Sequence, residues 1–128
     1  MKDLRSKIAA VAATKPAVLA ATETSAPIDL QGYNSAVVIV STGAIAGAGD
    51  YTTKLEHSDT TTGGDFTAVA AGDLLGAFPA SLAADSVYRV GYKGPKRYIR
   101  AVTTKNSGTS IAAAVLVVKS NGFNQPEA

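Results

Sequence analysis

The chain has 128 residues, a net charge of +2, and neither cysteine nor tryptophan. This length indicates a single domain with a core of its own, and the lack of cysteine excludes disulfides, thiolate nucleophiles and zinc–thiolate sites. No apolar run approaches the ~20 residues of a membrane span, so we expect no membrane partner.

The N-terminal segment has the pattern of a short amphipathic helix over residues 3–13. Leu4, Ile8 and Val11 recur at the i, i+4, i+7 spacing of one helix face. A helix of about eleven residues is marginal alone in water. We therefore expect residues 1–15 to form a helix or arm that docks on its own domain or on a neighbouring chain, which makes Leu4 and Ile8 candidate interface residues.

From residue 16 onward the pattern is that of β-strands. Runs of β-branched and alternating residues, separated by Gly, Ser and Asp turns, predict strands over 17–23, 35–43, 51–59, 86–92, 96–104 and 109–120. The predicted fold is all-β, an antiparallel β-sandwich or jelly roll over residues 16–120. Residues 121–128 look like a terminal tail.

The stretch "EHSD" (56–59) contains the chain's single histidine beside a serine and two acids. Neighbouring residues of a strand point to opposite faces, so Ser58 faces away from His57, whereas a triad needs both within ~3 Å. A strand end that runs into a polar turn is the better interpretation.

The loops contain carboxylates and glycines of the kinds found in binding motifs, but their spacing argues against such sites. The aspartates lack the dense alternation of a calcium loop, and the glycine-rich stretch lacks the GK[ST] ending of a phosphate cradle: Asp50, Asp59, Asp65, Asp73, Gly43, Gly47, Gly49. The sequence therefore predicts no enzyme, no metal site and no cofactor.

The stretch "GYKGPKRYIRA" (91–101) belongs to a basic region, since residues 89–105 contain six cations and no acid. Residues 86–92 and 96–104 flank "KGP" and predict a β-hairpin. Tyrosines and cations together are also typical of a platform for single-stranded nucleic acid.

Strand alternation in the basic region argues for a structural role. Tyr98 and Arg100 share one predicted face and Arg97 and Ile99 the other, so each face mixes charge with apolar bulk. An arginine beside buried apolar groups is rarely left unpaired, so we expect Arg97 or Arg100 to pair with an acid. Ion pairing or a subunit contact is favoured over nucleic acid, and the candidate interface residues are Arg89, Tyr92, Lys93, Lys96, Arg97 and Arg100.

Three segments together resemble a known family: "IDLQGYNSAVVIVSTGAIAGAGDYTTKLEHSD", "DFTAVAAGDLLGAF" and "YRVGYKGPKRYIRAVTT". They resemble small virion proteins of tailed bacteriophages and prophages that are encoded beside the major capsid protein. The resemblance covers roughly residues 28–118 and rests on strand and turn residues, with no catalytic residue to carry over.

The resemblance implies a jelly-roll auxiliary head protein that decorates or cements the capsid shell. It implies the major capsid protein as partner, a homo-oligomer, assembly in the cytoplasm of the bacterial host and a final location on the capsid surface. A head–tail or tail component is the alternative within the virion. From another class, a carbohydrate-binding β-sandwich module would use its tyrosines as stacking platforms: Tyr33, Tyr51, Tyr88, Tyr92 and Tyr98.

Overall fold

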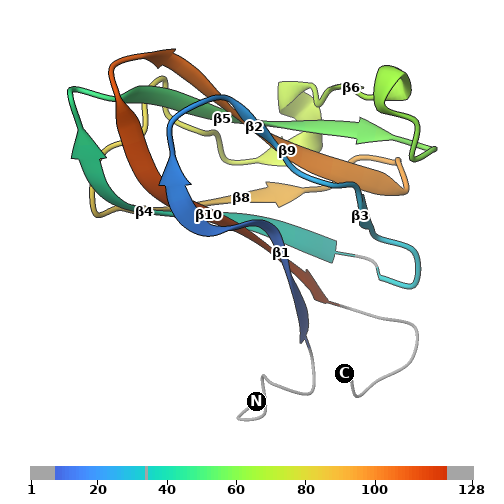
Figure 1. Cartoon of the computed structure of the whole chain (residues 1–128). Coiled ribbons are helices and arrows are strands. Elements are labelled where there is room, and N and C mark those ends of the chain that lie inside the picture. The colour runs from blue at the N-terminus through green and yellow to red at the C-terminus, as the bar shows by residue number, and fades with distance from the viewer. Residues whose placement is uncertain (1–7, 34, 121–128) are drawn as a thin grey trace, which may run out of the picture.

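The computed structural model describes residues 8–33 and 35–120, which form a sandwich of two antiparallel sheets (Figure 1). The predicted all-β sandwich is confirmed. The helical elements of the described chain are two short 3-10 turns, Gly63–Asp65 and Ala71–Asp73. No helix in this part of the chain is long and apolar enough to span a membrane.

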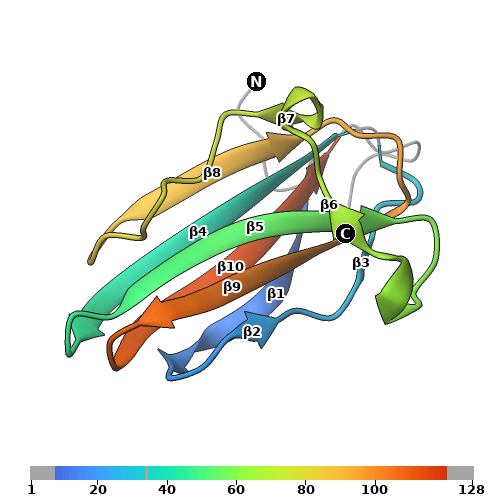
Figure 2. The same cartoon turned by 90° about the horizontal axis from the view of Figure 1, so that it is seen from above.

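The first sheet, sheet A, contains five strands in the order β1-β10-β4-β8-β7. Figure 2 shows its long strands running side by side. Their bounds are Ile8–Leu19 for β1, Ser110–Ser120 for β10, Ser35–Ala46 for β4, Val87–Tyr92 for β8 and Leu74–Leu75 for β7.

The second sheet, sheet B, has the order β2-β9-β5-β6, and β3 also pairs with β9. The bounds are Glu23–Thr24 for β2, Tyr98–Ser107 for β9, Asp50–Ser58 for β5, Thr67–Ala68 for β6 and Ile28–Asp29 for β3. The strands predicted at 35–43, 51–59 and 109–120 therefore correspond to β4, β5 and β10.

The core lies between the sheets and is built from alternate residues of the long strands. In β5, residues 51, 53, 55 and 57 are all buried, as their alternation predicts. The Tyr51 hydroxyl donates a hydrogen bond of 2.8 Å to the Leu19 carbonyl, so its polar end is satisfied inside the core. Sheet A contributes mainly small β-branched side chains: Val38, Val40, Val90, Ile111, Val115 and Val117.

The helix predicted at the N-terminus is wrong where the structure describes it, because residues 8–13 belong to strand β1. Pairing with β10 runs from Ile8 opposite Ser120 to Leu19 opposite Ile111. Without β1, strand β10 would be the edge of sheet A with its outer backbone groups unpaired. Pairing with β10 satisfies these groups and overrides the weak local helix pattern of residues 8–13. Leu4 lies outside the described residues.

Pro16, which follows the segment predicted to be helical, lies within β1. The pairing shifts register between Thr14 and Ala17, so the proline falls in an irregular part of an edge strand. Edge strands and bulges are where a sheet tolerates the missing N–H of proline. Strand β1 thus crosses the boundary expected between residues 15 and 16 and belongs to the sandwich.

The hairpin predicted around "KGP" is also wrong, because its two strands lie in different sheets. Strand β8 pairs with β4 and β7 in sheet A, whereas β9 pairs with β5, β2 and β3 in sheet B. Residues 93–97 therefore cross from one sheet to the other, and we call them the crossover. Each arm finds a partner elsewhere in the fold, since β4 and β5 each offer a long antiparallel edge.

Candidate functional site

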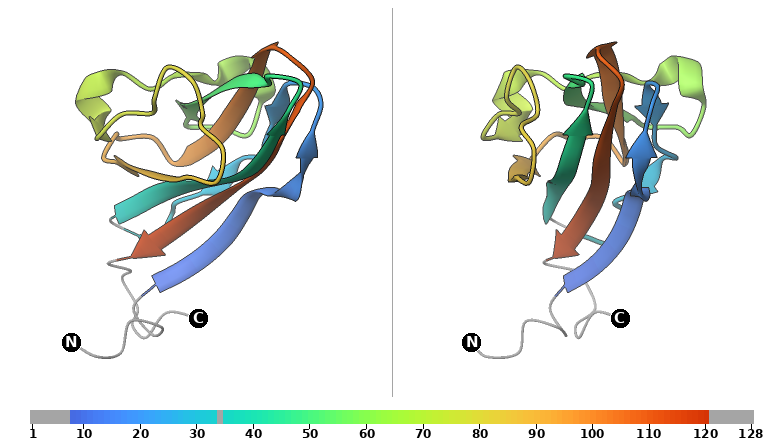
Figure 3. Two further views of the ribbon diagram at one scale, coloured as in Figure 1. Left: turned by 90° about the vertical axis from the view of Figure 1, so that its left-hand side faces the viewer. Right: turned by 60° about the vertical axis from the view of Figure 1, so that its left-hand side comes forward.

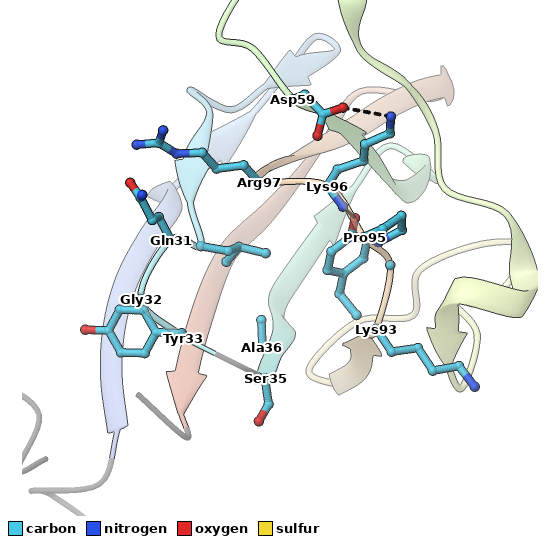
Figure 4. Close-up of a pocket in the computed structure, with 13 residues that line it drawn as sticks. Gln31, Gly32, Tyr33, Ser35, Ala36, Asp59, Lys93, Pro95, Lys96 and Arg97 are labelled. Carbon is cyan, nitrogen blue, oxygen red and sulfur yellow. Dashed lines mark hydrogen bonds and ion pairs between the residues drawn. The ribbon is translucent and has the colours of Figure 1, made fainter. Parts of the chain in front are cut away.

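The crossover and the loop between β3 and β4 form a pocket of about 520 Å³ at one end of the sandwich (Figure 4). It brings polar, aromatic and charged side chains together, among them Gln31, Tyr33, Asp59, Lys93, Lys96 and Arg97. Part of the basic segment (residues 89–105) therefore lines a concave surface, but its side chains point in different directions. Figure 4 shows Lys96 directed to Asp59, while Arg97 and Lys93 point to opposite sides of the pocket.

Tyr92 and His57 join the two sheets beneath the crossover. The Tyr92 hydroxyl lies 2.8 Å from His57 Nδ1, both side chains are buried, and their rings meet edge to face. The same hydroxyl accepts a bond of 3.2 Å from the Lys96 N–H. Burial raises the pKa of Tyr92, so the phenol remains protonated. The tautomer of the imidazole sets which partner donates in its bond with His57 Nδ1.

Gly94 is required by the position of this tyrosine. A Cβ at residue 94 would lie 2.6 Å from the Tyr92 hydroxyl and 2.7 Å from its ring. Real Cβ atoms do not approach other heavy atoms so closely, so a larger residue would displace either the ring or the chain. The glycine of "KGP" thus permits the crossover to close over Tyr92.

Arg97 ties the crossover to strand β3. Its Nε and Nη2 donate to the two carboxylate oxygens of Asp29, each at 2.9 Å, which is a bidentate pair. The hydrogen bond from Arg97 is the main cause that lowers the pKa of Asp29. Both side chains are more than 40% exposed, so the pair fixes geometry more than it adds stability.

Arg100 forms a second and less exposed pair on the outer face of sheet B. Its guanidinium lies 2.7 Å from Glu56 Oε1 and 4.4 Å from the centre of the Phe66 ring. Lys54 approaches the other oxygen of Glu56 at 3.5 Å. We expected Arg97 or Arg100 to pair with an acid, and both do.

The remaining predicted interface residues do not gather on one surface. Arg89 lies on the outer face of sheet A and Lys93 on the crossover, both exposed, and among the described residues neither has a carboxylate within ion-pair distance. Ile8 is half-buried at the start of β1. Tyr92 is buried, which excludes its ring as an exposed stacking platform.

Sequence reasoning missed the acidic partners of the basic segment, Asp29, Glu56 and Asp59. Glu56 lies directly opposite Arg100 in the β5–β9 register, and Lys96 Nζ lies 3.0 Å from Asp59. The alternation of β5 put Glu56 on its polar face, but nothing local indicated that β9 lies beside β5. The sequence therefore indicated that Glu56 faces solvent, but not that Arg100 is its partner.

The residues of "EHSD" are each bonded to a different part of the structure. The contacts of Glu56, His57 and Asp59 with Arg100, Tyr92 and Lys96 are described above. Ser58 Oγ accepts a 3.0 Å hydrogen bond from the Thr60 N–H. This geometry fits a strand end that runs into a polar turn. Within the described part of the chain, no group of three or more His, Cys, Asp or Glu residues is arranged to hold a metal ion.

Comparison with known proteins gives no family assignment: no family model matches the chain, and no curated protein matches it. Among solved structures, it is similar to a protein derived from the SPBc2 prophage, YomS (10% identity, TM-score 0.48, 88% of this chain and 93% of that one). It is also similar to a chain of the infectious bursal disease virus VP2 subviral particle (13% identity, TM-score 0.47, 94% of this chain and 34% of that one).

A chain of the infectious bursal disease virus Gx strain gives a similar result, with 15% identity, a TM-score of 0.45, and coverage of 94% of this chain and 33% of that one. This chain thus spans about a third of the length of the two bursal disease virus chains. At these identities and TM-scores, the similarities establish neither a common family nor a common function.

Proposed function

We propose that this chain is a non-enzymatic structural protein of a tailed-phage virion, an auxiliary head protein that binds the major capsid lattice as a decoration or cement protein. Two lines support the proposal: the resemblance of three segments to small virion proteins, and the β-sandwich fold that this resemblance implies. The observation that carries it is the internal ion pairing of the basic segment.

That ion pairing uses the residues best suited to bind a polyanion. Lys96, Arg97 and Arg100 are each held by a carboxylate of the same chain. A nucleic-acid platform needs cations free to replace phosphate counterions. These pairs instead tie the crossover to β3 and to the turn after β5, and tie β9 to β5, as suits a rigid part that carries load through protein contacts.

A decoration protein acts by bridging neighbouring capsid subunits. Many copies, each bound by modest contacts, stabilise a shell because every further contact forms at high effective concentration. Such a protein would assemble in the host cytoplasm and lie on the outside of the mature capsid.

The test is a comparison of purified virions with and without this chain. Virions that lack it should release their genome at lower temperature, or after milder osmotic shock, and re-addition of the purified protein should restore the difference. Electron microscopy should show many copies over the shell, whereas a single ring at the vertex would assign the chain to the head–tail joint. Absence of the chain from virions would remove the proposal altogether.

The carbohydrate-binding alternative receives less support from the side chains. Tyr51 and Tyr92 are buried, and Tyr88 packs against the core with its hydroxyl bound by the Ala83 N–H. Tyr33 and Tyr98 each have a cation over one ring face, at 4.6 and 4.9 Å. Glycan-array binding that disappears in Tyr33→Ala would nevertheless favour this alternative.

A further inference from the structure

The outer face of sheet A is apolar and collects the exposed large hydrophobic residues of the described chain. These are Val18, Leu75, Val87 and Leu116, between 37% and 69% exposed. Leu116 lies between Val115 and Val117, whose side chains enter the core, so its own side chain faces outward. Figure 3 shows β4, β10 and β1 side by side in this sheet.

The pairing register places all four on the same side, because residues directly opposite one another on paired strands share a face. Leu116 is opposite Ile39 on β4 and Ala12 on β1. Val18 is opposite Ala112, Val87 is opposite Ser41, and Leu75 is opposite Gly91. The same face continues across the sheet through the pairs Val118–Val37 and Ala114–Ser41. On the strands β10, β4 and β8, Arg89 is the one charged side chain of this face, and the edge strand β1 adds the exposed Lys15 at its register shift.

The outer face of sheet B is different in kind. Lys54, Glu56 and Arg100 form an ion-paired group there, and Asn106 donates a 2.8 Å hydrogen bond to Thr52. Polar groups that satisfy one another lose little by facing water. Contiguous apolar surface of the sheet A kind typically marks a site of protein association.

We propose that a second copy of this chain packs against the outer face of sheet A, so that two sandwiches stack sheet to sheet in an isologous dimer. With about 4.8 Å between neighbouring strands and a rise of about 3.3 Å per residue, the face formed by β1, β10, β4 and β8 has an area of about 600 Å². A dimer would therefore bury about 1,200 Å² in total, which reaches the range of stable interfaces.

Side-chain size also favours another sheet as the occupant. Ala12, Ala112 and Ala114 alternate on this face with Leu116 and Ile39, so small and large side chains interleave. Sheets that pack face to face approach to about 10 Å with such interdigitation. A second copy presents the same alternation of small and large side chains, as an isologous contact requires.

The position of Arg89 fits a twofold axis along the strands between β10 and β4. Such an axis places β8 of one copy over β1 of the other, because the sheet order is β1-β10-β4-β8. Arg89 then lies over the alanine-rich edge strand of the partner rather than over the partner's own Arg89. Its guanidinium can reach water past that edge while its methylene groups cover apolar surface.

Sedimentation velocity of the full chain over a range of concentrations tests the dimer. The unmodified protein should show reversible, concentration-dependent association to twice the monomer mass. Leu116→Lys and Val87→Lys should each raise the dissociation constant at least about tenfold, since a charge in an apolar interface is costly. Thr104→Lys, on the outer face of sheet B, is the matched control and should change it less than about twofold.

Circular dichroism separates misfolding from lost association. Val87→Ser is the second variant in case a lysine variant fails to fold, because a side chain that is 69% exposed leaves no core cavity when it is shortened. An unmodified protein that stays monomeric, or face variants that associate like it, would overturn the dimer.

Capsid binding by a monomer that Leu116→Lys abolishes would also overturn it and assign the face to the shell. Dimerisation without any capsid binding would leave the dimer standing and remove the proposed function instead.

Discussion

Arg97 and Arg100 show how two similar residues, three positions apart, come to differ in energetic weight. Arg97 and Asp29 are 43% and 44% exposed, whereas Arg100 and Glu56 are 19% and 13% exposed. Water screens the first pair, and the second is partly shielded by the Phe66 ring. The bidentate geometry of Arg97 is the more regular, but burial decides which pair matters for stability.

We predict that Arg100→Ala lowers the free energy of unfolding by about 2 kcal/mol, because it leaves Glu56 half-buried without its main partner. Arg97→Ala should cost clearly less than Arg100→Ala, since both members of its pair already face water. Urea unfolding at neutral pH measures both. Lys54→Ala, which removes a more exposed contact to the same Glu56, is the control and should cost less than either. Equal losses for the two arginine variants would refute this ranking.

The Asp29 pair also predicts how stability changes with pH. The hydrogen bond from Arg97 lowers the pKa of Asp29 below its ordinary value of 3.8. A lowered pKa in the folded state contributes stability above the ordinary value, and that contribution disappears as the pH falls through the folded-state pKa. Because the pair is exposed, the contribution is small, below about 1 kcal/mol.

The measurement compares the native protein with Asp29→Asn by urea unfolding across pH. The stability advantage of the native protein should be constant between about pH 5 and pH 7 and should shrink as the pH falls below about 4. Arg97→Ala serves as the control, since it removes the cause of the pKa shift and should flatten the same profile. An advantage that grows on acidification would contradict the assignment.

At the scale of elements, the conformation of the crossover depends on the absence of a side chain at Gly94. Gly94 passes within contact distance of the Tyr92 ring, and the Tyr92 hydroxyl in turn holds His57 from the opposite sheet. The five residues of the crossover thus determine how the end of β8 in sheet A meets the start of β9 in sheet B. A change that displaces the crossover should therefore alter the surroundings of His57.

We predict that Gly94→Ala destabilises the protein by about 1–3 kcal/mol, because the added Cβ overlaps the Tyr92 ring and forces a shift in packed surroundings. Gly72→Ala is the matched control, since nothing lies within 4 Å of a Cβ there. Thermal unfolding gives the energies. The imidazole proton resonances of the single histidine should move in Gly94→Ala and stay in place in Gly72→Ala. Unmoved resonances in Gly94→Ala would show that the crossover does not control His57.

At the scale of the whole molecule, the basic segment no longer acts as a basic surface once the chain is folded. Its cations are distributed over the crossover and the outer faces of both sheets, and three of them are neutralised by Asp29, Glu56 and Asp59. Of the other three, Arg89 and Lys93 are exposed on different parts of the molecule, and the Lys105 ammonium donates a 3.2 Å hydrogen bond to the Ala20 carbonyl. A polyanion would meet at most one or two of them at a time.

We therefore predict no measurable binding of single-stranded DNA at physiological salt. At low salt, any residual binding should have a log–log salt slope no steeper than about −1.5, because only about two phosphates are neutralised. Fluorescence anisotropy with a labelled oligonucleotide measures this. Glu56→Gln, which releases Arg100, is the informative comparison and should bind no more weakly than the native protein. A steep slope, with affinity falling by orders of magnitude between low and physiological salt, would reverse the structural interpretation of the basic segment.

Several features could be read from the sequence because they depend on local periodicity. The β-branched runs became β4 and β10, and the alternation of Tyr51, Leu55 and His57 became the buried face of β5. Hydrophobic period specifies which side chains must be buried and therefore the element type, wherever both faces of the strand have a clear preference. The candidate site was foreseeable only as a basic segment whose arginines need carboxylates.

The partners of each strand and each charge were decided by the tertiary structure. Residues 8–13 carry alanines that suit helix and strand alike, so the free edge of β10 settled their conformation. The two arms around "KGP" look like a hairpin locally, yet β4 and β5 offered longer edges in opposite sheets. Strand pairing and ion pairing join residues far apart in the chain, and their energies depend on which edges and faces meet. The sequence by itself therefore determined the strands that have a clear hydrophobic period, β4, β5 and β10, and the buried face of β5. Only the packed fold determined strand β1, the crossover, its ion pairs and the apolar face of sheet A.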